Sequence, residues 1–229
     1  MRSMEIRTKA LWILTFVCIL PLAIVQKATA GSPAAHIRWD VLGFDAATNS
    51  VITGTTANGG TASATAYDGS TITFTGSGNF VVPASGGGSS ATGAGTWTTT
   101  AGCPPGGTGT TVCPTGSPGS ATQNASGTYQ VTKLVRFDLT AGTLAGQGLN
   151  DGIGNIDDTH AGLAIFLITY SDGSHGILVF SCSLFAAGTT PPSLTPSDVF
   201  EGVTATKGAV DFENAIFPPV GTLFHIPSK

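Results

Sequence analysis

The segment from residue 150 to 160, NDGIGNIDDTH, holds the densest group of oxygen-bearing side chains in the chain. Calcium takes about six to eight oxygen ligands, often from flexible loops that contain glycine. The candidate metal ligands are Asp151, Asn155, Asp157 and Asp158; no cofactor is expected from the sequence as a whole, and calcium is the one that this segment allows. Their spacing lacks the closing glutamate of the common calcium-binding loop. The alternative is a solvated loop whose side chains accept hydrogen bonds from neighbouring backbone amides.

A second pair of acidic residues, Asp211 and Glu213, lies two positions apart in a segment that reads as a strand. Such side chains share one face of a strand at roughly 6 to 7 Å, a separation compatible with paired-carboxylate glycoside hydrolysis. Acids on the polar face of a hairpin are far more common as simple surface residues. The chain contains no G-x-S-x-G, P-loop, H-E-x-x-H or dinucleotide-binding pattern, so the sequence favours a protein that is not an enzyme.

The strand predicted from Gly127 to Leu139 carries a lysine on its otherwise apolar face. Tyr129 and Lys133 share that face, and Trp97 opens an earlier strand after a glycine-rich segment. Aromatic and basic side chains at one end of a barrel can line a ligand cavity, so we predict Trp97, Tyr129 and Lys133 as ligand-binding residues. The alternative places Lys133 at a β-bulge or a sheet edge, where its charge reaches water.

The first thirty residues have the parts of a secretory signal peptide. Basic residues precede an apolar run from Ala10 to Val25, and Ala28 and Ala30 place small residues at the cleavage positions. The apolar run is short for a membrane span. We therefore expect a cleavable signal peptide at residues 1–30 and a secreted or periplasmic chain, residues 31–229, without a membrane anchor.

Cleavage at that point removes four of the nine basic residues and only one of the thirteen acidic residues. The mature chain then carries five basic and twelve acidic residues, a net charge of −7. A nucleic-acid-binding protein needs a basic face, and an anionic membrane attracts basic segments. We therefore expect neither nucleic acid nor membrane among the partners. Charged residues are sparse and glycine is abundant, and the β-branched and aromatic residues favour an all-β protein.

Three cysteines remain after cleavage. Cys103 and Cys113 flank PPGGTGTTV, a segment with few apolar side chains, and exported proteins fold in an oxidising compartment. We predict a disulfide between these two residues, which would stabilise the fold by roughly 2 to 3 kcal/mol. Cys182 lies in an apolar segment and is expected to behave as a small buried hydrophobic residue.

Two apolar runs between Ala161 and Leu184 flank Asp172-Gly173, the most specific turn signal in the chain. A two-residue Asp-Gly loop has positive φ at both positions and pairs Ile168 with Ile177. Both faces of this hairpin are apolar, so we expect other elements to cover both of them. The rest of the fold is expected to be built around this hairpin.

Two more hairpins and a closing strand are expected. The turn signal Asp68-Gly69 places Tyr67 and Phe74 on the core face of one hairpin. Lys207-Gly208 marks the other hairpin, and residues 216–226 supply a closing strand.

Short strands, glycine-rich turns and the lack of a convincing helix predict a single all-β domain over residues 31–229. We expect an antiparallel barrel or β-sandwich of about ten to twelve strands. Loops rich in glycine, serine and proline are expected at 83–92 and 101–126. Glycines stand just before strands that open with an aromatic residue, which suggests that aromatic rings cover bare backbone.

These features favour an exported, non-enzymatic β module that binds a small apolar or carbohydrate ligand. One alternative is a secreted hydrolase or metal-dependent enzyme that uses acidic and histidine residues near 151–160 or 211–213. Another alternative is a structural cell-surface protein. An open cavity at a barrel end favours the first function, carboxylates and histidines that converge in a cleft favour the second, and a filled interior favours the third.

Overall fold

The computed structural model describes residues 34–54, 60–82, 90–102, 124–184, 199–216 and 221–227. These residues form fourteen strands and one short 3₁₀ helix, η2 (Ile156–Asp158), and no α-helix. None of them forms a helix that is long and apolar enough to cross a membrane. The predicted all-β fold is confirmed for this part of the chain.

The strands range from two to sixteen residues in length. In chain order they are β1 (Ala35–Asp45), β2 (Ser50–Thr53), β3 (Ala62–Thr65), β4 (Thr71–Phe74), β5 (Ser77–Val82), β6 (Ala91–Thr100), β7 (Ala125–Thr140), β8 (Asn150–Asp151), β9 (Thr159–Tyr170), β10 (His175–Cys182), β11 (Gly202–Lys207), β12 (Val210–Phe212), β13 (Asn214–Ile216) and β14 (Thr222–His225).

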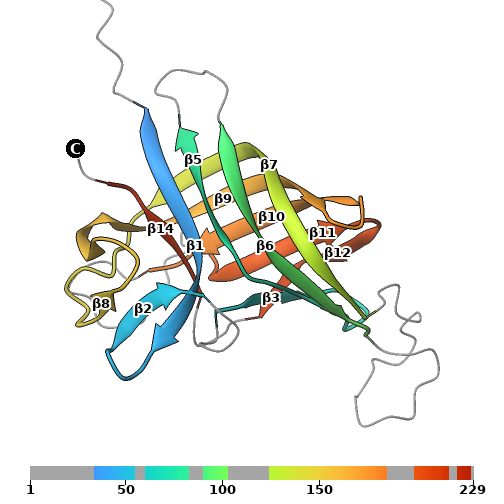
Figure 1. Ribbon diagram of the computed structural model, residues 1–229, viewed down its shortest axis with the longest axis horizontal. Coiled ribbons are helices and arrows are strands. Elements are labelled where there is room, and N and C mark those ends of the chain that lie inside the picture. The colour runs from blue at the N-terminus through green and yellow to red at the C-terminus, as the bar shows by residue number, and fades with distance from the viewer. Residues whose placement is uncertain are drawn as a thin grey trace, which may run out of the picture. The chain divides into compact units, whose positions relative to one another are not determined.

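Six of these strands close into a ring (Figure 1). The order around it is β1, β5, β6, β7, β9, β14 and back to β1, and every neighbouring pair is antiparallel. β14 closes the ring because it pairs with β1 on one side and with β9 on the other. The predicted closing strand is confirmed, and the barrel is the observed architecture of the two that the sequence left open.

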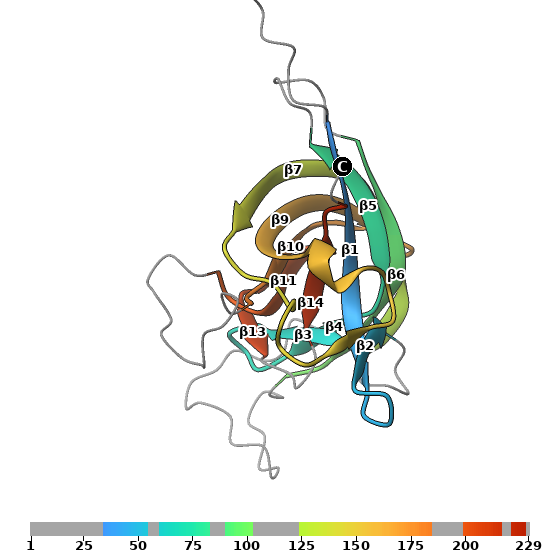
Figure 2. The same ribbon diagram turned by 90° about the vertical axis from the view of Figure 1, so that its left-hand side faces the viewer.

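The other eight strands lie outside this ring. β10, β11 and β12 continue the sheet from β9, whereas β4, β3 and β13 continue it from β6. Figure 2 shows β7, β9 and β10 curving around one side, with β1, β5 and β6 on the other. The number of strands exceeds the predicted total, in part because β8 and β13 have only two and three residues, too few to show a pattern in the sequence.

Aromatic side chains fill the core that these strands enclose. Trp39 contacts Phe166 and Phe180, with ring centroids 5.4 and 5.0 Å apart. Phe224 contacts Phe180 at 5.3 Å and Phe80 at 6.1 Å. All five side chains are at most 1% exposed. Burial of a ring of this size stabilises the fold by roughly 2 to 3 kcal/mol, so this cluster is a main source of barrel stability.

Two glycines make room for Trp39. Gly78 on β5 pairs with Trp39 on β1 and with Gly93 on β6. A β-carbon at Gly78 would lie 2.7 Å from the indole Nε1, and one at Gly93 would lie 2.4 Å from Cζ2. The indole therefore covers bare backbone, in agreement with the glycines that precede aromatic residues in the sequence.

The central hairpin, β9 and β10, has a three-residue loop, which corrects the predicted two-residue turn. The Tyr170 N–H donates to the Ser174 carbonyl, and the Gly173 N–H donates to the Tyr170 carbonyl. Gly173 has a φ of 85°, whereas Asp172 is not among the residues with positive φ. This combination is a tight turn followed by a glycine bulge, a frequent alternative to the two-residue loop.

The extra loop residue shifts the strand pairing by one position. Ile177 pairs with Leu167, and Ile168 pairs with Gly176. A shift of one residue moves every side chain to the opposite face of the strand. Leu167 and Ile177 are 38% and 42% exposed, so the prediction that both faces of the hairpin are covered was wrong here.

The hairpin of β3 and β4 has the same one-position shift, since Thr65 pairs with Thr71 instead of Ile72. Tyr67, which a two-residue loop would place in the core, is 75% exposed. Ala64 pairs with Ile72, and both are fully buried. The alanine face of this hairpin is therefore the core face.

The hairpin of β11 and β12 is shifted by two positions, because Ala205 pairs with Phe212 and not with Val210. A shift of two residues keeps each side chain on its original face. Val203, Ala205 and Phe212 are accordingly buried, as the sequence predicts, and Asp211 is exposed.

Several predictions fall outside the described residues. They include the signal peptide at 1–30, the disulfide between Cys103 and Cys113, and most of the predicted loops at 83–92 and 101–126. Of the described residues in those two segments, 91–92 belong to β6 and 125–126 to β7.

Substitution of Gly78 by alanine is expected to destabilise the barrel by about 2 to 3 kcal/mol, because the new methyl group would overlap Trp39 and the backbone of β6. Urea denaturation followed by tryptophan fluorescence measures the change. The neighbouring variant Asn79→Ala, at an exposed position, is the control and should change stability little. Equal stability of the two variants would contradict the packing of Trp39 on glycine.

Candidate functional site

A shallow hollow of about 230 Å³ lies on the outside of the barrel, where β7, β9 and the loop after β9 meet. Its lining combines the hydroxyl and amide side chains of Thr128, Gln130, Thr169 and Ser171 with apolar surface, and no side chain in that lining is charged. The hydroxyls of Tyr129 and Tyr170 donate to the carbonyls of Thr75 and Thr206. The lining residues are Thr128, Tyr129, Gln130, Thr169, Tyr170 and Ser171. Each hydroxyl can both donate and accept a hydrogen bond, and an amide offers both functions at fixed positions.

Backbone and side-chain hydrogen bonds fix the walls of this hollow. The Ser171 N–H donates to the Thr128 carbonyl, and the Thr128 N–H donates to the Ser171 hydroxyl. Gln130 and Thr169 face each other across the β7–β9 ladder. The Thr169 hydroxyl lies 3.1 Å from Nδ1 of His175, on the neighbouring strand. The polar groups of the hollow are therefore held by regular strand pairing.

A lysine and two aromatic rings lie beneath the hollow. The ammonium group of Lys207 lies 4.3 Å from the ring centroid of Trp97 and 4.9 Å from that of Tyr170. It also contacts the Asp172 carboxylate and donates to the Ser174 hydroxyl at 3.1 Å. The hydrogen bond from Lys207, followed by those from Ser174, lowers the pKa of Asp172 to about 2. These contacts tie β11, β6 and the loop that carries Ser171 into one unit.

The structure separates the three predicted ligand-binding residues. Tyr129 lines the hollow but is 1% exposed, and Trp97 is buried at 2%. Lys133 is exposed at a bulge of β7, which was the alternative for this residue. The lysine that lies against the aromatic rings is Lys207, which the sequence did not single out. The predicted ligand-binding role of these residues stays a prediction.

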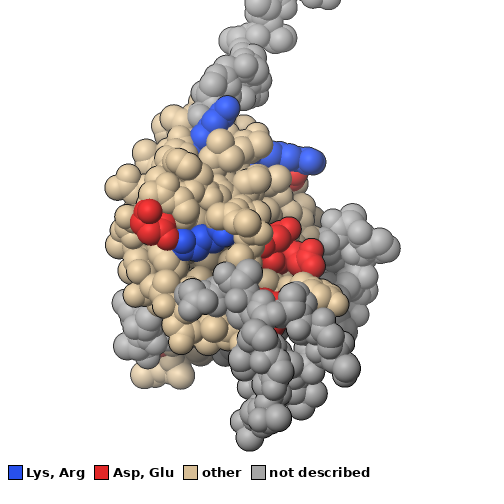
Figure 3. Space-filling view, turned by 90° about the vertical axis from the view of Figure 1, so that its right-hand side faces the viewer, with Lys and Arg blue, Asp and Glu red and all other residues tan. Residues whose placement is uncertain are grey.

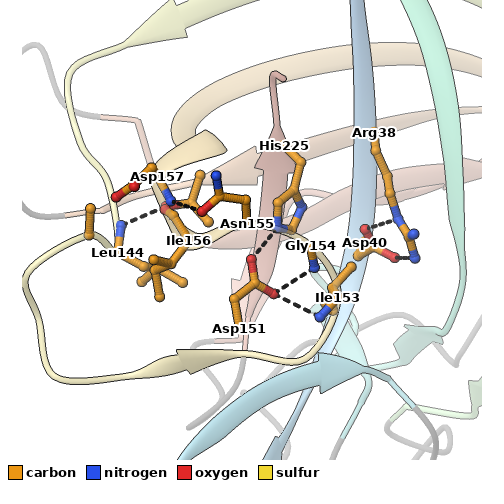
Figure 4. A network of polar contacts seen from close by, with 12 residues as sticks. Arg38, Asp40, Leu144, Asp151, Ile153, Gly154, Asn155, Ile156, Asp157 and His225 are labelled. Carbon is orange, nitrogen blue, oxygen red and sulfur yellow. Dashed lines mark hydrogen bonds and ion pairs between the residues drawn. The ribbon is translucent and has the colours of Figure 1, made fainter. Parts of the chain in front are cut away.

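A second polar arrangement joins the predicted acidic segment to the barrel (Figure 4). Nε2 of His225 on β14 donates to the Asp151 carboxylate at 2.8 Å. The same carboxylate accepts from the backbone amides of Ile153 and Gly154, at 2.8 and 3.1 Å. The side chains of Asp151 and His225 are only 2% and 6% exposed. Burial opposes the charge of Asp151, but these hydrogen bonds prevail and lower its pKa.

Arg38 and Asp40 of β1 lie beside this pair, as Figure 4 shows, because Arg38 pairs with His225 across the β1–β14 ladder. The guanidinium donates twice to the Asp40 carboxylate, at 2.7 and 2.8 Å. The hydrogen bond to Asp40 raises the pKa of Arg38 despite partial burial. Asp40 is fully buried, so this ion pair satisfies a charge that would otherwise be costly.

The candidate metal ligands do not converge. Asn155 accepts from the Asp157 amide at the start of η2, and Asp157 is exposed. Asp158 adjoins β9, where its carbonyl accepts from the Ile226 amide. No group of three or more histidine, cysteine or acidic side chains is placed to hold a metal ion in the described part of the chain. The observed contacts match the alternative of side-chain to backbone hydrogen bonds.

The carboxylates of the other predicted acidic pair are solvent-accessible. Asp211 lies on β12, opposite Thr206 of β11, and Glu213 lies between β12 and β13. Both residues are exposed. Both side chains therefore lie at the surface, as in the alternative of simple surface residues.

Glu201 is a carboxylate that the sequence gave no reason to select. It accepts from the Ser183 amide at 2.6 Å, and from the Thr222 amide and hydroxyl at 2.7 and 3.0 Å. Burial outweighs these hydrogen bonds and raises the pKa of Glu201 to about 7. Glu201 joins the end of β10 to the start of β14. The neighbouring Cys182 is fully buried as a free thiol, as its apolar position predicts.

Comparisons with models of known protein families, with curated proteins and with solved structures found no match.

Replacement of Asp151 by asparagine is expected to lower the free energy of unfolding by about 2 to 4 kcal/mol at neutral pH, because His225 loses its charged acceptor. The folded-state pKa of Asp151 is lowered, so its stabilisation is present above the ordinary aspartate pKa of about 3.9 and is lost as the pH falls. Urea titrations at neutral and acidic pH measure the free energy of unfolding of both proteins. The difference between Asp151→Asn and wild type should become smaller at acidic pH. The exposed Asp157→Asn is the matched control.

Glu201 should give the opposite pH dependence. Its pKa is 4.5 in the reference state and about 7 in the fold, so the unfolded chain loses this proton first and stability falls as the pH rises between these values. The fall attributable to this group is about 3 kcal/mol. The variant Glu201→Gln should remove that component from a urea denaturation series across this range, while Glu213→Gln should retain it. Identical pH profiles of wild type and Glu201→Gln would contradict this assignment.

Proposed function

We propose that this protein is an exported, non-enzymatic β-barrel module that binds a neutral carbohydrate in the hollow between β7 and the β9–β10 loop. The observation that carries the proposal is the uncharged lining of hydroxyl and amide groups. Sugar hydroxyls donate and accept hydrogen bonds, and Gln130 with the neighbouring serine and threonine hydroxyls offers both. The volume of about 230 Å³ suits one sugar ring.

The surroundings of the hollow support a neutral ligand. The strands β3, β4 and β6, and β7 as far as Thr132, contain no charged residue. Figure 3 shows a face on which neutral residues predominate and charged groups occupy a few separate places. The charged groups next to the hollow, Asp172 and Lys207, are paired with each other, so an anionic or cationic ligand would have to compete with that ion pair.

The packed core supports a site on the outside of the barrel. The Trp39 ring contacts those of Phe166 and Phe180 in the core, and all three are fully buried. An apolar ligand would need an open interior to remove its surface from water. Of the two ligand classes that the composition suggested, carbohydrate is therefore the one we propose.

The acidic and histidine residues support a binding function over hydrolysis. Asp151 and His225 are engaged with each other and with backbone amides, and they lie nearly inaccessible to solvent. A general base must reach the proton that it removes from a substrate. This pair is better suited to fasten the segment before β9 to the barrel.

Screening against an array of neutral and acidic oligosaccharides, followed by calorimetry with the strongest neutral binder, tests the proposal. Replacement of Gln130 by alanine should raise the dissociation constant about tenfold, because it removes one or two hydrogen bonds of roughly 1 kcal/mol each. The control is Lys133→Ala, farther along the same strand and exposed, which should leave affinity unchanged.

Three results would overturn the proposal. They are the absence of binding to any neutral glycan, a preference for acidic glycans, and unchanged affinity of Gln130→Ala. A loss of affinity in Lys133→Ala alone would instead place the ligand at the lysine.

A further inference from the structure

A row of hydroxyl groups starts at Thr128 of the hollow and runs across β7 and β6 to Thr75, the residue after β4. Thr128 of the hollow pairs with Thr96 on β6. The Thr96 hydroxyl lies 2.6 Å from that of Thr75, which follows β4, and the Thr75 amide donates to the Thr96 carbonyl. Thr96 and Thr128 are exposed and Thr75 is half-buried. The polar, uncharged lining of the hollow therefore continues across the sheet without interruption.

Two further rows run beside the first. Thr98 pairs with Ser126 on one side and with Thr73 on the other, and Thr100 pairs with Thr71. Neighbouring strands lie about 4.8 Å apart, and alternate residues along one strand lie roughly 6.7 Å apart. The spacing between strands is close to the length of one sugar residue in an extended chain. Each row therefore offers hydroxyls at about one sugar repeat from strand to strand, and successive rows are more widely spaced along the strands.

An exposed aromatic ring stands at the far end of this surface. Tyr67 occupies the loop between β3 and β4, next to the row that contains Thr71, and is 75% exposed. A tyrosine at such a position presents a flat apolar face together with a hydroxyl. Stacking on a sugar ring buries one face of the aromatic ring while the hydroxyl stays hydrated. Strand geometry places Tyr67 roughly 15 to 20 Å from Thr128.

From this juxtaposition we infer that the ligand is an extended, unbranched neutral polysaccharide, which runs from the hollow across the threonine rows of β6 and β4 to Tyr67. This inference rests on the proposed function, because it extends the same site. The strands along this path contain no charged residue, and at its two ends Asp172 is paired with Lys207 and the Asp68 carboxylate accepts from the Ser70 amide. An uncharged chain therefore meets no unpaired ion when it loses water. Many weak contacts along a chain add to an affinity that one sugar ring in a small hollow cannot supply.

Affinity as a function of chain length tests the inference. Calorimetry with a neutral monosaccharide, and with the linear hexasaccharide of the same sugar, should show affinity that rises at least tenfold with length. Tyr67→Ala should reduce hexasaccharide affinity about fivefold to tenfold and leave monosaccharide affinity unchanged. Tyr67→Phe keeps the stacking face and should bind nearly as well as wild type. Val135→Ala, which removes an exposed apolar side chain from β7, is the matched control.

The outcomes distinguish this inference from the proposed function. Equal affinity for both lengths, or no effect of Tyr67→Ala on the hexasaccharide, would overturn the extended path. The proposed function would still stand if Gln130→Ala weakened binding of the same sugar. Binding of the hexasaccharide that responds to Tyr67→Ala but not to Gln130→Ala would overturn the hollow as the anchor. Absence of binding to either sugar form would overturn both.

Discussion

The packing of Trp39 against glycine is the constraint on which the barrel depends. An indole on β1 occupies the core only because the facing positions on β5 and β6, Gly78 and Gly93, have no side chain. The indole Nε1 is buried with no hydrogen-bond partner among the described residues, which costs about 1 to 3 kcal/mol. Burial of the ring and its contacts with Phe166 and Phe180 offset that cost. A core filled in this way is the reason for proposing a ligand site on the outer surface.

The sequence predicts the strands and their closure better than their register. Alternation of apolar residues and glycine-rich turns identifies the all-β fold, and the segment after residue 216 supplies the closing strand. The error at Asp172-Gly173 and at Asp68-Gly69 has one cause. An Asp-Gly pair fits a two-residue loop and also the end of a three-residue loop, where only the glycine needs positive φ. The two loops place opposite faces in the core, and local sequence does not choose between them.

The candidate site depends on contacts between distant segments, which single-sequence patterns do not reveal. The lysine that contacts Trp97 and Tyr170 comes from β11, so its role follows from the arrangement of the sheet and not from any spacing in the chain. His225 meets Asp151 across 74 positions for the same reason. The acidic segment was correctly singled out as a dense group of polar residues. Its side chains hold backbone amides and one imidazole, whereas a metal site would need them to converge.

The neutrality of the threonine surface is more informative than its threonine content. Threonine is common in strands because a β-branched side chain suits the pleated sheet, so an exposed threonine requires no ligand to explain it. Exposed strands usually also carry lysine or acidic residues, which keep the surface soluble and discourage pairing with other chains. Charged residues return on β7 from Lys133 onward, with the Arg136–Asp138 ion pair. The strand segments between the hollow and Tyr67 therefore contain no charged residue, and the charged groups at the two ends, Asp172 with Lys207 and Asp68, are already engaged with partners within the fold.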